Sequence, residues 1–340
     1  MANTESLFPI LNEKRISPLA RAAAKAELDF TGCRTEYRPL VTKSILSKVI
    51  SNRNLPFTYA INPYRGCEFA CRYCYARYAH EFLELKPEDF EHKIYFKENA
   101  RWMLTQELKR LAPETDIALG TATDPYQPLE RKRFVTRSIL EAFASTSGLG
   151  LGIVTKSTLI SRDIDLLKEI ARRHRLTVHL TITTVDADLA RILEPRAPRP
   201  DLRMKTVGRL RRAGLRAGVM CSPLMPGITD SRSSIGAVAK AAAAEDASFF
   251  FAGALFLKPC SQPTFFEFVG KHFPQQLEAY RRRYSDNAFV SKEYRERLQK
   301  LVEMIRRENK LRGRRESTPI NSGDGSKPEP VMVQPWLPFS

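Results

Sequence analysis

Several features that mark exported or membrane proteins are absent from the sequence. Only six cysteines occur in 340 residues, which is too few for a disulfide framework, and no secretory signal opens the chain. No apolar run approaches the length of a membrane span. Hydrophobic residues make up 43% of the chain, which predicts a sizeable core in one large domain with tails or in two ordinary domains. We therefore expect a cytoplasmic protein with no membrane partner.

Acidic residues are also in short supply. The chain has 38 Asp and Glu against 55 Lys and Arg, and its formal net charge is +17. A strong positive field favours polyanions, so nucleic acid is a candidate partner. Much of the charge lies in two stretches, residues 191–216 and residues 281–315. The alternative is that both stretches are solvated helix faces of an arginine-rich protein, and charge alone leaves both interpretations open.

Three of the cysteines, Cys67, Cys71 and Cys74, fall within eight residues at the spacing C-x3-C-x2-C. Thiolates so close in sequence can converge on one inorganic centre, and thiolate is the ligand that iron–sulfur clusters select. A four-iron cluster needs four ligands, so three cysteines leave one iron open to bind and activate another molecule. A structural zinc site with His80 as a ligand is the alternative, but the third cysteine would then be surplus. The spacing favours a catalytic cluster.

The residues around these cysteines resemble a known family. Residues 61–77 read INPYRGCEFACRYCYAR, which resembles the cluster loop of radical S-adenosylmethionine (SAM) enzymes, most of all the bacterial branch related to spore photoproduct lyase. The resemblance extends from about residue 43 to about residue 259. It implies a [4Fe–4S] cluster whose open iron chelates SAM, and a reducing electron donor such as flavodoxin or ferredoxin. One electron then cleaves SAM to methionine and a 5′-deoxyadenosyl radical, which abstracts hydrogen from a substrate.

Apolar, strand-like segments alternate with helix-like segments along the middle of the chain. Such alternation predicts a parallel sheet with right-handed crossovers, and six units fall short of the eight of a closed barrel. The resemblance implies the remaining step, so we expect an α/β fold: a partial (β/α)6 TIM-like barrel of the radical SAM type with a C-terminal helical extension. The expected strands cover residues 57–62, 116–120, 150–155, 176–183, 215–221 and 249–257, and the expected helices cover residues 98–111, 138–144, 163–173, 202–213 and 234–244.

The same pattern divides the chain into four regions. Residues 1–42 form an N-terminal extension that we expect to be partly disordered, although residues 18–28 could form a helix. Residues 43–274 form the radical SAM core, and residues 275–311 form a basic helical extension. Residues 312–340 are rich in Pro, Gly and Ser and lack a periodic apolar pattern, which predicts a disordered tail.

Polar or reactive residues follow each of the six expected strands. In parallel βα folds, chemistry collects at the carboxyl ends of the strands. Any one of these groups alone would mean little, but six together predict a single site. They are the cysteine loop, residues 120–130, residues 155–157, residues 181–184, residues 221–223 and Lys258.

Four residues match positions that the family uses to hold SAM, a fifth, Thr183, is a candidate ribose contact at a strand end, and each of the five has a structural alternative. Tyr73 falls where the family places a residue near the adenine, or it packs beside the loop. Thr123 and Asp124 match the segment that receives the SAM amino group, or they form an Asp-Pro turn. Lys156 matches a lysine that approaches the SAM carboxylate, or it extends out of a strand end. Thr183 hydrogen-bonds the ribose, or it satisfies neighbouring backbone.

The chain departs from the family at the hydrogen donor. Spore photoproduct lyase has, in a C-T-S-D context, a cysteine that returns a hydrogen atom to the substrate radical, whereas Thr121 stands at this position here. A hydroxyl O–H bond is much stronger than a thiol S–H bond, which argues against repair of thymine photodimers by that route. Cys221 is the remaining candidate donor, and burial as a small packed residue is its alternative. Tyr126 and Glu130 either face the substrate or order the loop.

Two function hypotheses remain. The first is a lyase-like radical SAM enzyme that acts on an unidentified substrate, with nucleic acid as the candidate. The second is an iron–sulfur redox, sensory or nucleic-acid-binding module without SAM turnover, which rests on the basic stretches and the unassigned hydrogen donor. The two differ in turnover, because only the enzyme should cleave SAM reductively.

Overall fold

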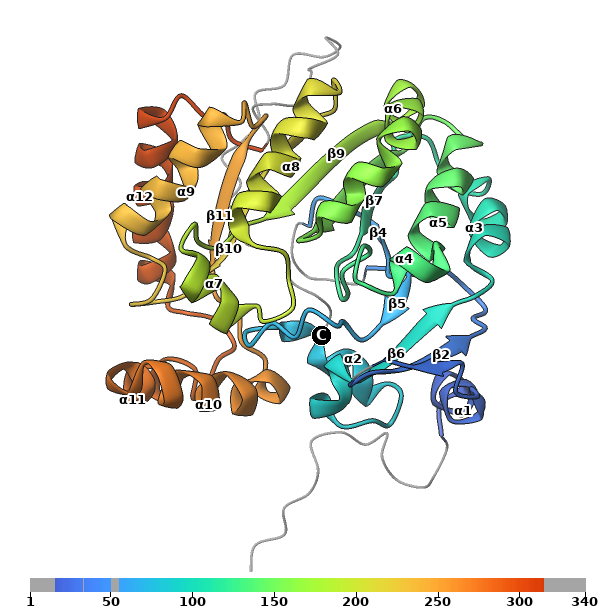
Figure 1. Cartoon of the computed structure of the whole chain (residues 1–340), viewed down its shortest axis with the longest axis horizontal. Coiled ribbons are helices and arrows are strands. Elements are labelled where there is room, and N and C mark those ends of the chain that lie inside the picture. Colours follow the sequence, from blue (N-terminus) through green and yellow to red (C-terminus); the bar gives the residue numbers. More distant parts are fainter. Residues whose placement is uncertain (1–15, 33, 50–54, 315–340) are drawn as a thin grey trace, which may run out of the picture.

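A seven-stranded sheet forms the centre of the molecule (Figure 1). The structure is a computed structural model that describes residues 16–32, 34–49 and 55–314. Six of its strands are parallel and lie side by side in chain order, which confirms the six expected strands, and the seventh joins the edge antiparallel. The strands are β3 (Leu46–Lys48, antiparallel), β4 (Tyr59–Ile61), β7 (Asp116–Leu119), β8 (Gly150–Thr155), β9 (Arg175–Thr181), β10 (Ala217–Leu224) and β11 (Phe250–Ala254).

Helices cover the outer face of this sheet, as Figure 1 shows. Parallel strands in chain order are joined by right-handed crossovers, so the connecting helices fall on one side and the sheet curls with its other face inward. Within the described residues, β3 and β11 each pair with one strand only, so the sheet does not close on itself, and the barrel stays a prediction. The connecting helices are α3 (Ala100–Leu108), α4 (Glu130–Arg133), α5 (Val135–Ala144), α6 (Ile164–Arg173), α7 (Ala187–Leu193), α8 (Pro200–Arg212) and α9 (Arg232–Ala244).

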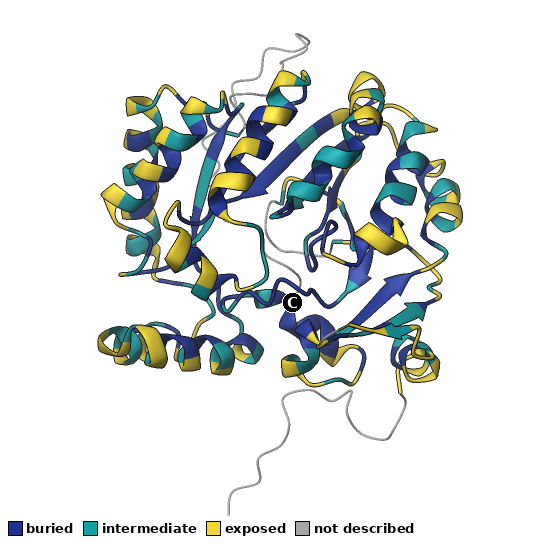
Figure 2. Cartoon of the chain, viewed as in Figure 1, coloured by how far each residue is buried: buried dark blue, intermediate teal, exposed yellow. Residues whose placement is uncertain are grey.

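The core lies between the sheet and these helices. In α6, Leu166, Leu167 and Ile170 are buried on one face while Asp165 and Lys168 are exposed, as expected of an amphipathic surface helix. β8 and β9 are buried along most of their length because both of their faces are covered, and the residues of β8 are mostly apolar. Figure 2 shows the buried residues following the strands and the inner faces of the helices. This packing holds the strand ends at fixed positions.

A second, smaller sheet is a feature that the sequence pattern does not predict. Its strands are paired in the order β1-β2-β6-β5, and they have only two to five residues each. Strands so short show no clear alternation of apolar and polar residues. β5 leads from β4 directly into the cysteine loop. The elements of this part are α1 (Pro18–Lys25, the helix expected within residues 18–28), β1 (Phe30–Thr31), β2 (Glu36–Leu40), β5 (Tyr64–Arg65), α2 (Tyr78–Glu81) and β6 (Lys93–Lys97).

The C-terminal extension completes the outer layer. Its last helix packs against β11 and α9 and buries Leu298, Val302 and Ile305. The domain boundaries themselves stay a prediction, and residues 315–340 of the expected tail lie outside the described residues. In the part of the chain that the structure describes, no helix is long and apolar enough to cross a membrane. The elements are α10 (Gln262–His272), α11 (Leu277–Arg283) and α12 (Lys292–Glu308), and the short 3-10 helices of the chain are η1 (Tyr75–Arg77), η2 (Pro87–Glu91), η3 (Thr158–Asp163), η4 (Pro259–Ser261) and η5 (Pro274–Gln276).

Candidate active site

A cavity lies at the carboxyl ends of the parallel strands, the edge at which such folds collect their chemistry. Its wall is built from the loops after β4, β7 and β8 and from the ends of β9 and β10, with residues at and just after the end of β11. The expected gathering of strand ends is thus confirmed, although Lys258 does not line the cavity. The lining residues are Cys67, Phe69, Cys71, residues 73–76, residues 120–124, residues 154–156, Thr181, Met220, Ser222, Pro223, Ala254 and Phe256.

The three cysteines lie together on the wall of this cavity. Cys67 and Cys71 are 9% and 7% exposed, and all three thiols line the same space. Gly66 sets the entry to the loop: its φ is +85°, and a Cβ there would come within 2.8 Å of the Phe90 carbonyl oxygen, so only glycine fits. From the β7 side, the Thr123 hydroxyl donates to the Gly66 carbonyl at 2.6 Å. The loop is therefore held in shape by its surroundings.

Burial makes these thiols poor acids on their own. It raises the pKa of Cys71 to about 12 and raises the pKa values of Cys67 and Cys74 as well. A bound metal centre removes this obstacle, because it deprotonates the thiols that coordinate it. Two buried cysteines and the partly buried Cys74 on one wall therefore fit a metal centre better than they fit three unliganded thiols.

Zinc fits this arrangement poorly. With a Zn–S bond of about 2.3 Å, a single ion needs its ligands within about 4 Å of one another. No three His, Cys, Asp or Glu side chains of the described residues come together to hold one ion. His80, the candidate zinc ligand, is engaged elsewhere: its Nε2 lies 3.0 Å from the Lys93 carbonyl oxygen and its ring packs against Phe90. A four-iron cluster binds each cysteine at a different corner and so spans thiols that are farther apart.

Asp124 ties the loop after β7 to the end of β8. Its Oδ1 accepts from the Thr155 hydroxyl at 2.7 Å and from the Tyr126 N–H at 2.9 Å, and its Oδ2 accepts from the Lys156 N–H at 2.7 Å. Burial raises the pKa of this carboxyl, although the hydrogen bonds oppose the shift. Thr123 lines the cavity too, but its hydroxyl hydrogen is already donated to the cysteine loop. Both predicted residues thus lie at the cavity. Asp124 also forms the turn of the structural alternative, whereas Thr123 supports the cysteine loop instead.

Lys156 lines the cavity among groups of negative charge. Burial alone would lower its pKa, but the charges of Cys71, Glu194 and Asp124 outweigh burial, and the pKa is raised. The ammonium therefore stays protonated. Its Nζ lies 5.7 Å from the centroid of the Tyr73 ring, in cation–π contact. A protonated lysine at this wall suits an anionic group such as a carboxylate.

A buried ion pair that the sequence did not predict lies behind Tyr73. The Tyr73 hydroxyl donates to Glu194 Oε1, and the other oxygen of Glu194 pairs with Arg203 of α8. Arg203 also donates to the Thr181 carbonyl at 3.0 Å. Burial alone would raise the pKa of Glu194, but Arg203 and Lys156 hold it below its ordinary value. Glu194 therefore stays ionised beside Arg203, and its hydrogen bond with the Tyr73 hydroxyl orients the Tyr73 ring.

Two residues predicted for the site do not line the cavity. The Thr183 hydroxyl donates to Glu194 at 3.5 Å, and Thr181 takes its place in the wall. Cys221 lies between Met220 and Ser222, which both line the cavity, and because successive strand side chains alternate between faces, its thiol points away. The Cys221 sulfur lies 3.8 Å from the Thr183 carbonyl oxygen. The ribose contact and the hydrogen-donor role stay predictions, and this placement favours neither.

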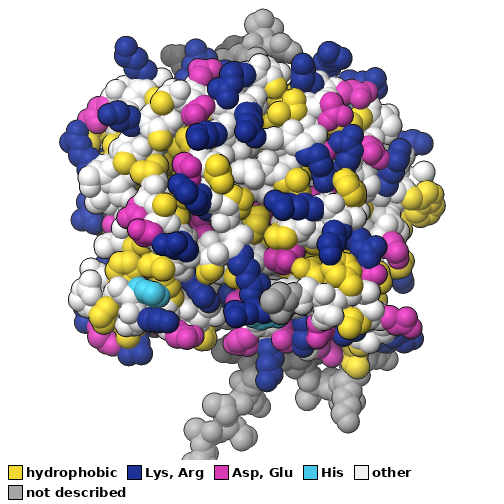
Figure 3. Space-filling model, in the orientation of Figure 1, with side chains coloured by type: hydrophobic (Ala, Val, Ile, Leu, Met, Phe, Trp, Pro, Cys, Tyr) yellow, Lys and Arg dark blue, Asp and Glu magenta, His cyan; other side chains and the backbone are white. Residues whose placement is uncertain are grey.

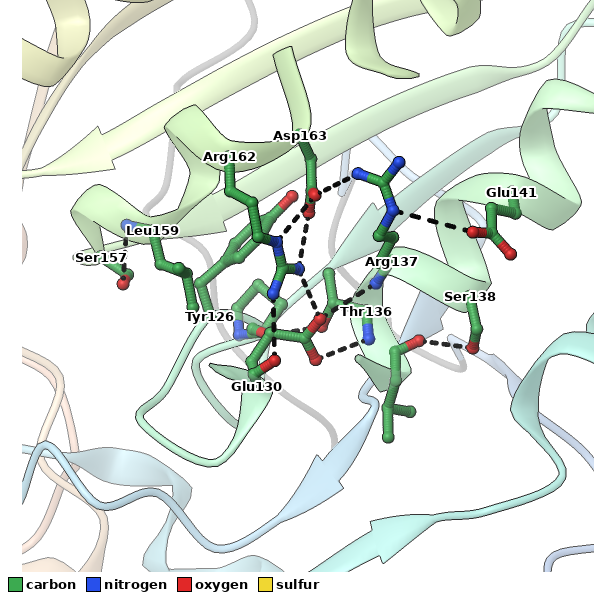
Figure 4. Close-up of polar contacts among 12 residues, drawn as sticks. Tyr126, Glu130, Thr136, Arg137, Ser138, Glu141, Ser157, Leu159, Arg162 and Asp163 are labelled. Carbon is green, nitrogen blue, oxygen red and sulfur yellow. Dashed lines mark hydrogen bonds and ion pairs between the residues drawn. The ribbon is translucent and has the colours of Figure 1, made fainter. Parts of the chain in front are cut away.

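Glu130 orders the loop after β7. Its side chain is fully buried, and Figure 4 shows Arg162 contacting both Glu130 and Asp163. Both oxygens of Glu130 are therefore used by groups of the protein itself, which supports the structural alternative for this residue. Its four donors are the Tyr64 hydroxyl, the Thr136 N–H at 2.8 Å, the Arg137 N–H at 3.1 Å and the Arg162 guanidinium at 2.9 Å.

Comparison with known proteins identifies the family. Over residues 61–234, which include all three cysteines, the sequence matches the radical SAM superfamily. The chain belongs to this superfamily. An uncharacterized protein of Mycobacterium tuberculosis is 34% identical over 279 residues, which are 82% of this chain and 82% of that protein. An uncharacterized protein of Methanocaldococcus jannaschii is 31% identical over 178 residues, which are 52% of this chain and 64% of that protein.

The fold of this radical SAM protein is similar to that of spore photoproduct lyase. A mutant of the lyase matches with a TM-score of 0.62 at 15% sequence identity, over 89% of this chain and 85% of that chain. A second mutant, with bound AdoMet and dinucleoside spore photoproduct, matches with a TM-score of 0.58 at 14% identity, over the same 89% and 85%. At such low identity the similarity concerns the fold alone.

Proposed function

We propose that this radical SAM protein is an enzyme that reductively cleaves SAM at a [4Fe–4S] cluster and directs the resulting 5′-deoxyadenosyl radical at a substrate still to be identified. The observation that carries the proposal is the shared cavity, in which the three cysteines of the loop and the protonated Lys156 line one space. The cluster would supply the electron that breaks the sulfonium C–S bond and the open iron that chelates SAM.

The protein's own residues would hold and orient SAM. Lys156 would bind its carboxylate through a charge-assisted contact. A carboxylate has about four acceptor sites, and the protein uses three of those of Asp124, so one remains for the SAM ammonium beside Thr123. The Tyr73 ring, oriented by the buried ion pair, would pack against the adenine. Thr183 is the predicted ribose contact, and the neighbouring Thr181 occupies the wall itself.

The substrate side of the cavity is apolar. Phe69, Tyr75, Met220 and Phe256 supply this wall, which would keep water away from a reactive radical. At Thr121 a hydroxyl stands where a thiol donor would be needed, so we expect a reaction other than thymine photodimer repair. The electron donor, such as flavodoxin or ferredoxin, and a cytoplasmic location stay predictions.

Nucleic acid is the candidate substrate, supported by the charge of +17 and by the dinucleoside spore photoproduct bound in a protein of similar fold. The basic stretch at residues 191–216 supports it less than the sequence implied. Arg203 is buried, and four exposed or half-exposed arginines of this stretch are in ion pairs with nearby acids, namely Arg191, Arg199, Arg211 and Arg212. Figure 3 shows Lys and Arg side chains spread over one face of the molecule without a single dominant patch.

Formation of 5′-deoxyadenosine tests the proposal. Protein reconstituted anaerobically and carrying four irons should release it from SAM when a strong reductant is added, and the Cys71→Ala variant should release none. DNA, RNA and nucleotides are then added to look for stimulated turnover. If fully loaded wild-type protein cleaves no SAM under any of these conditions, the alternative of a redox or sensory module is the better account.

A further inference from the structure

A basic pocket lies at the turn between α11 and α12. Four cationic side chains line it, those of Arg282, Arg283, Lys292 and Arg295. Among the described lining residues the single carboxylate is that of Asp286, which accepts a hydrogen bond from the Ser285 hydroxyl at 2.9 Å. We call this the α11–α12 pocket. Its lining therefore carries a clear excess of positive charge.

The arginines of this pocket lack acidic partners. The neighbouring Arg281 and Lys292 pair with Glu278 and Glu296, whereas no ion pair within the described part of the chain involves Arg282, Arg283 or Arg295. Buried guanidinium nitrogens are also left without a hydrogen bond, at Nη1 of Arg283 and Nε of Arg295. A buried polar group without a partner costs free energy, and an anion in the pocket would offset the unpaired charge.

Aromatic rings hold two of these guanidinium groups in place. That of Arg283 lies 5.9 Å from the ring centroids of both Tyr280 and Tyr294, and that of Arg295 lies 5.8 Å from the Phe289 ring. A stacked guanidinium keeps its planar donor fork in one orientation, which suits two-point recognition of phosphate. The pocket also includes Ser291, the N-cap of the 17-residue helix α12, whose positive end adds to the field.

Two aromatic residues in contact with each other separate the α11–α12 pocket from the catalytic cavity. Phe289 lines the pocket and Phe256 lines the cavity. The two residues form a β-bridge, and their ring centroids are 4.6 Å apart. On the cavity side, Phe256 packs edge-on against Tyr75 at 5.9 Å. Figure 1 shows α10 and α11 lying along the same edge of the molecule as α2, which follows the cysteine loop.

We infer that the substrate of this enzyme carries a phosphate group, and that the α11–α12 pocket binds it while the reacting part of the substrate enters the cavity past Phe256. The inference rests on the proposed function for the cavity. A phosphate suits the pocket because guanidinium groups from two elements, α11 and α12, converge there with little competing negative charge. A free phosphate ester and the backbone phosphate of a single-stranded nucleic acid offer this same chemistry.

Binding measured without turnover tests the pocket. Cluster-loaded protein without reductant is titrated in a calorimeter with inorganic phosphate, with a nucleoside 5′-monophosphate, and with a single-stranded DNA or RNA 12-mer. We expect Arg282→Ala and Arg295→Ala each to weaken binding of a phosphate-bearing probe by about tenfold, as for lost hydrogen bonds to a charged group. Arg307→Ala is the matched control, because it removes the same charge from the exposed far end of α12.

The pattern of losses identifies the source of the phosphate. Pocket-dependent binding of phosphate or the mononucleotide indicates a free phosphate ester, and pocket-dependent binding of the 12-mers alone indicates a nucleic-acid backbone. The inference is overturned if no probe binds, or if the pocket variants weaken binding no more than Arg307→Ala does. SAM is not cleaved in this experiment. A negative 5′-deoxyadenosine assay would therefore contradict the proposed function, but the binding result for the pocket could still be interpreted.

Discussion

Replacing Arg203 with methionine should strongly destabilise the protein, because it removes the partner of a buried charge. Glu194 and Arg203 have side chains that are 0% and 1% exposed, so water cannot solvate the carboxylate once the guanidinium is gone. Breaking a buried pair from one side costs about 3–5 kcal/mol. The variant also removes the donor that two backbone carbonyls use, which places the expected loss in the upper part of that range.

A surface pair on the same segment provides the comparison. Arg199 and Asp201 have side chains that are 70% and 45% exposed, so Arg199→Met should cost at most about 1 kcal/mol. The double variant Arg203→Met/Glu194→Gln removes both buried charges while Gln still accepts from the Tyr73 hydroxyl. It should recover most of the stability that the single variant loses, because the main penalty is the uncompensated carboxylate.

Urea unfolding followed by circular dichroism measures the free energy of unfolding of all these proteins. The reasoning is refuted if Arg203→Met costs no more than Arg199→Met. It is equally refuted if the double variant loses the sum of the two single losses, since the two side chains would then act independently.

Three further predictions concern the loop, the cofactor and pH. Gly66→Ala should lower the iron content after reconstitution, because a Cβ would meet the Phe90 carbonyl oxygen at 2.8 Å, whereas Gly236→Ala, with open space around it, should leave the iron content unchanged. Lys156→Met should weaken SAM binding by about tenfold in equilibrium dialysis at unchanged iron content. Although burial opposes the shift, the pKa of Glu194 is lowered in the folded protein. Its ion pair therefore stabilises the fold above the unfolded pKa of about 4.3, and this contribution is lost as the pH falls through the lower folded pKa. Urea unfolding from about pH 6 to about pH 3 should show this loss of stability in the wild type and not in the Glu194→Gln variant.

The sequence predicted the central sheet because its strands are buried and strongly apolar. β8 illustrates this: it is a mostly apolar segment between stretches of helical periodicity. β9 alternates Leu and Val with Thr and His, and it is buried along most of its length. The small sheet was not predicted, because its strands are short and derive their stability from pairing with one another. β2, for example, pairs along its full length with β6, more than 50 residues away in the sequence. Pairing over such distances leaves no local pattern to detect.

The site was predictable where its functional residues lie close together in the sequence or directly follow a strand. The cysteine spacing identified three residues that line the cavity, and the positions after β7 and β8 identified Asp124 and Lys156, which line it as well. The Glu194–Arg203 pair was not found, because it joins residues on either side of a proline-rich turn and its charges looked like part of a basic surface stretch. The one signal for it was that Glu194 is one of only two acidic residues within the basic stretch at residues 191–216. Only the fold shows that both side chains turn inward beneath Tyr73.

The edge position of β11 places one wall of the cavity at an open edge of the sheet. Within the described residues this strand pairs with β10 alone, yet Ala254 at its end and Phe256 just beyond it help to enclose the cavity. Edge strands fray at a smaller free energy than global unfolding requires. Warming should therefore open the cavity while the remaining helices and strands are still folded. Enzyme activity should be lost several degrees below the temperature at which the protein unfolds.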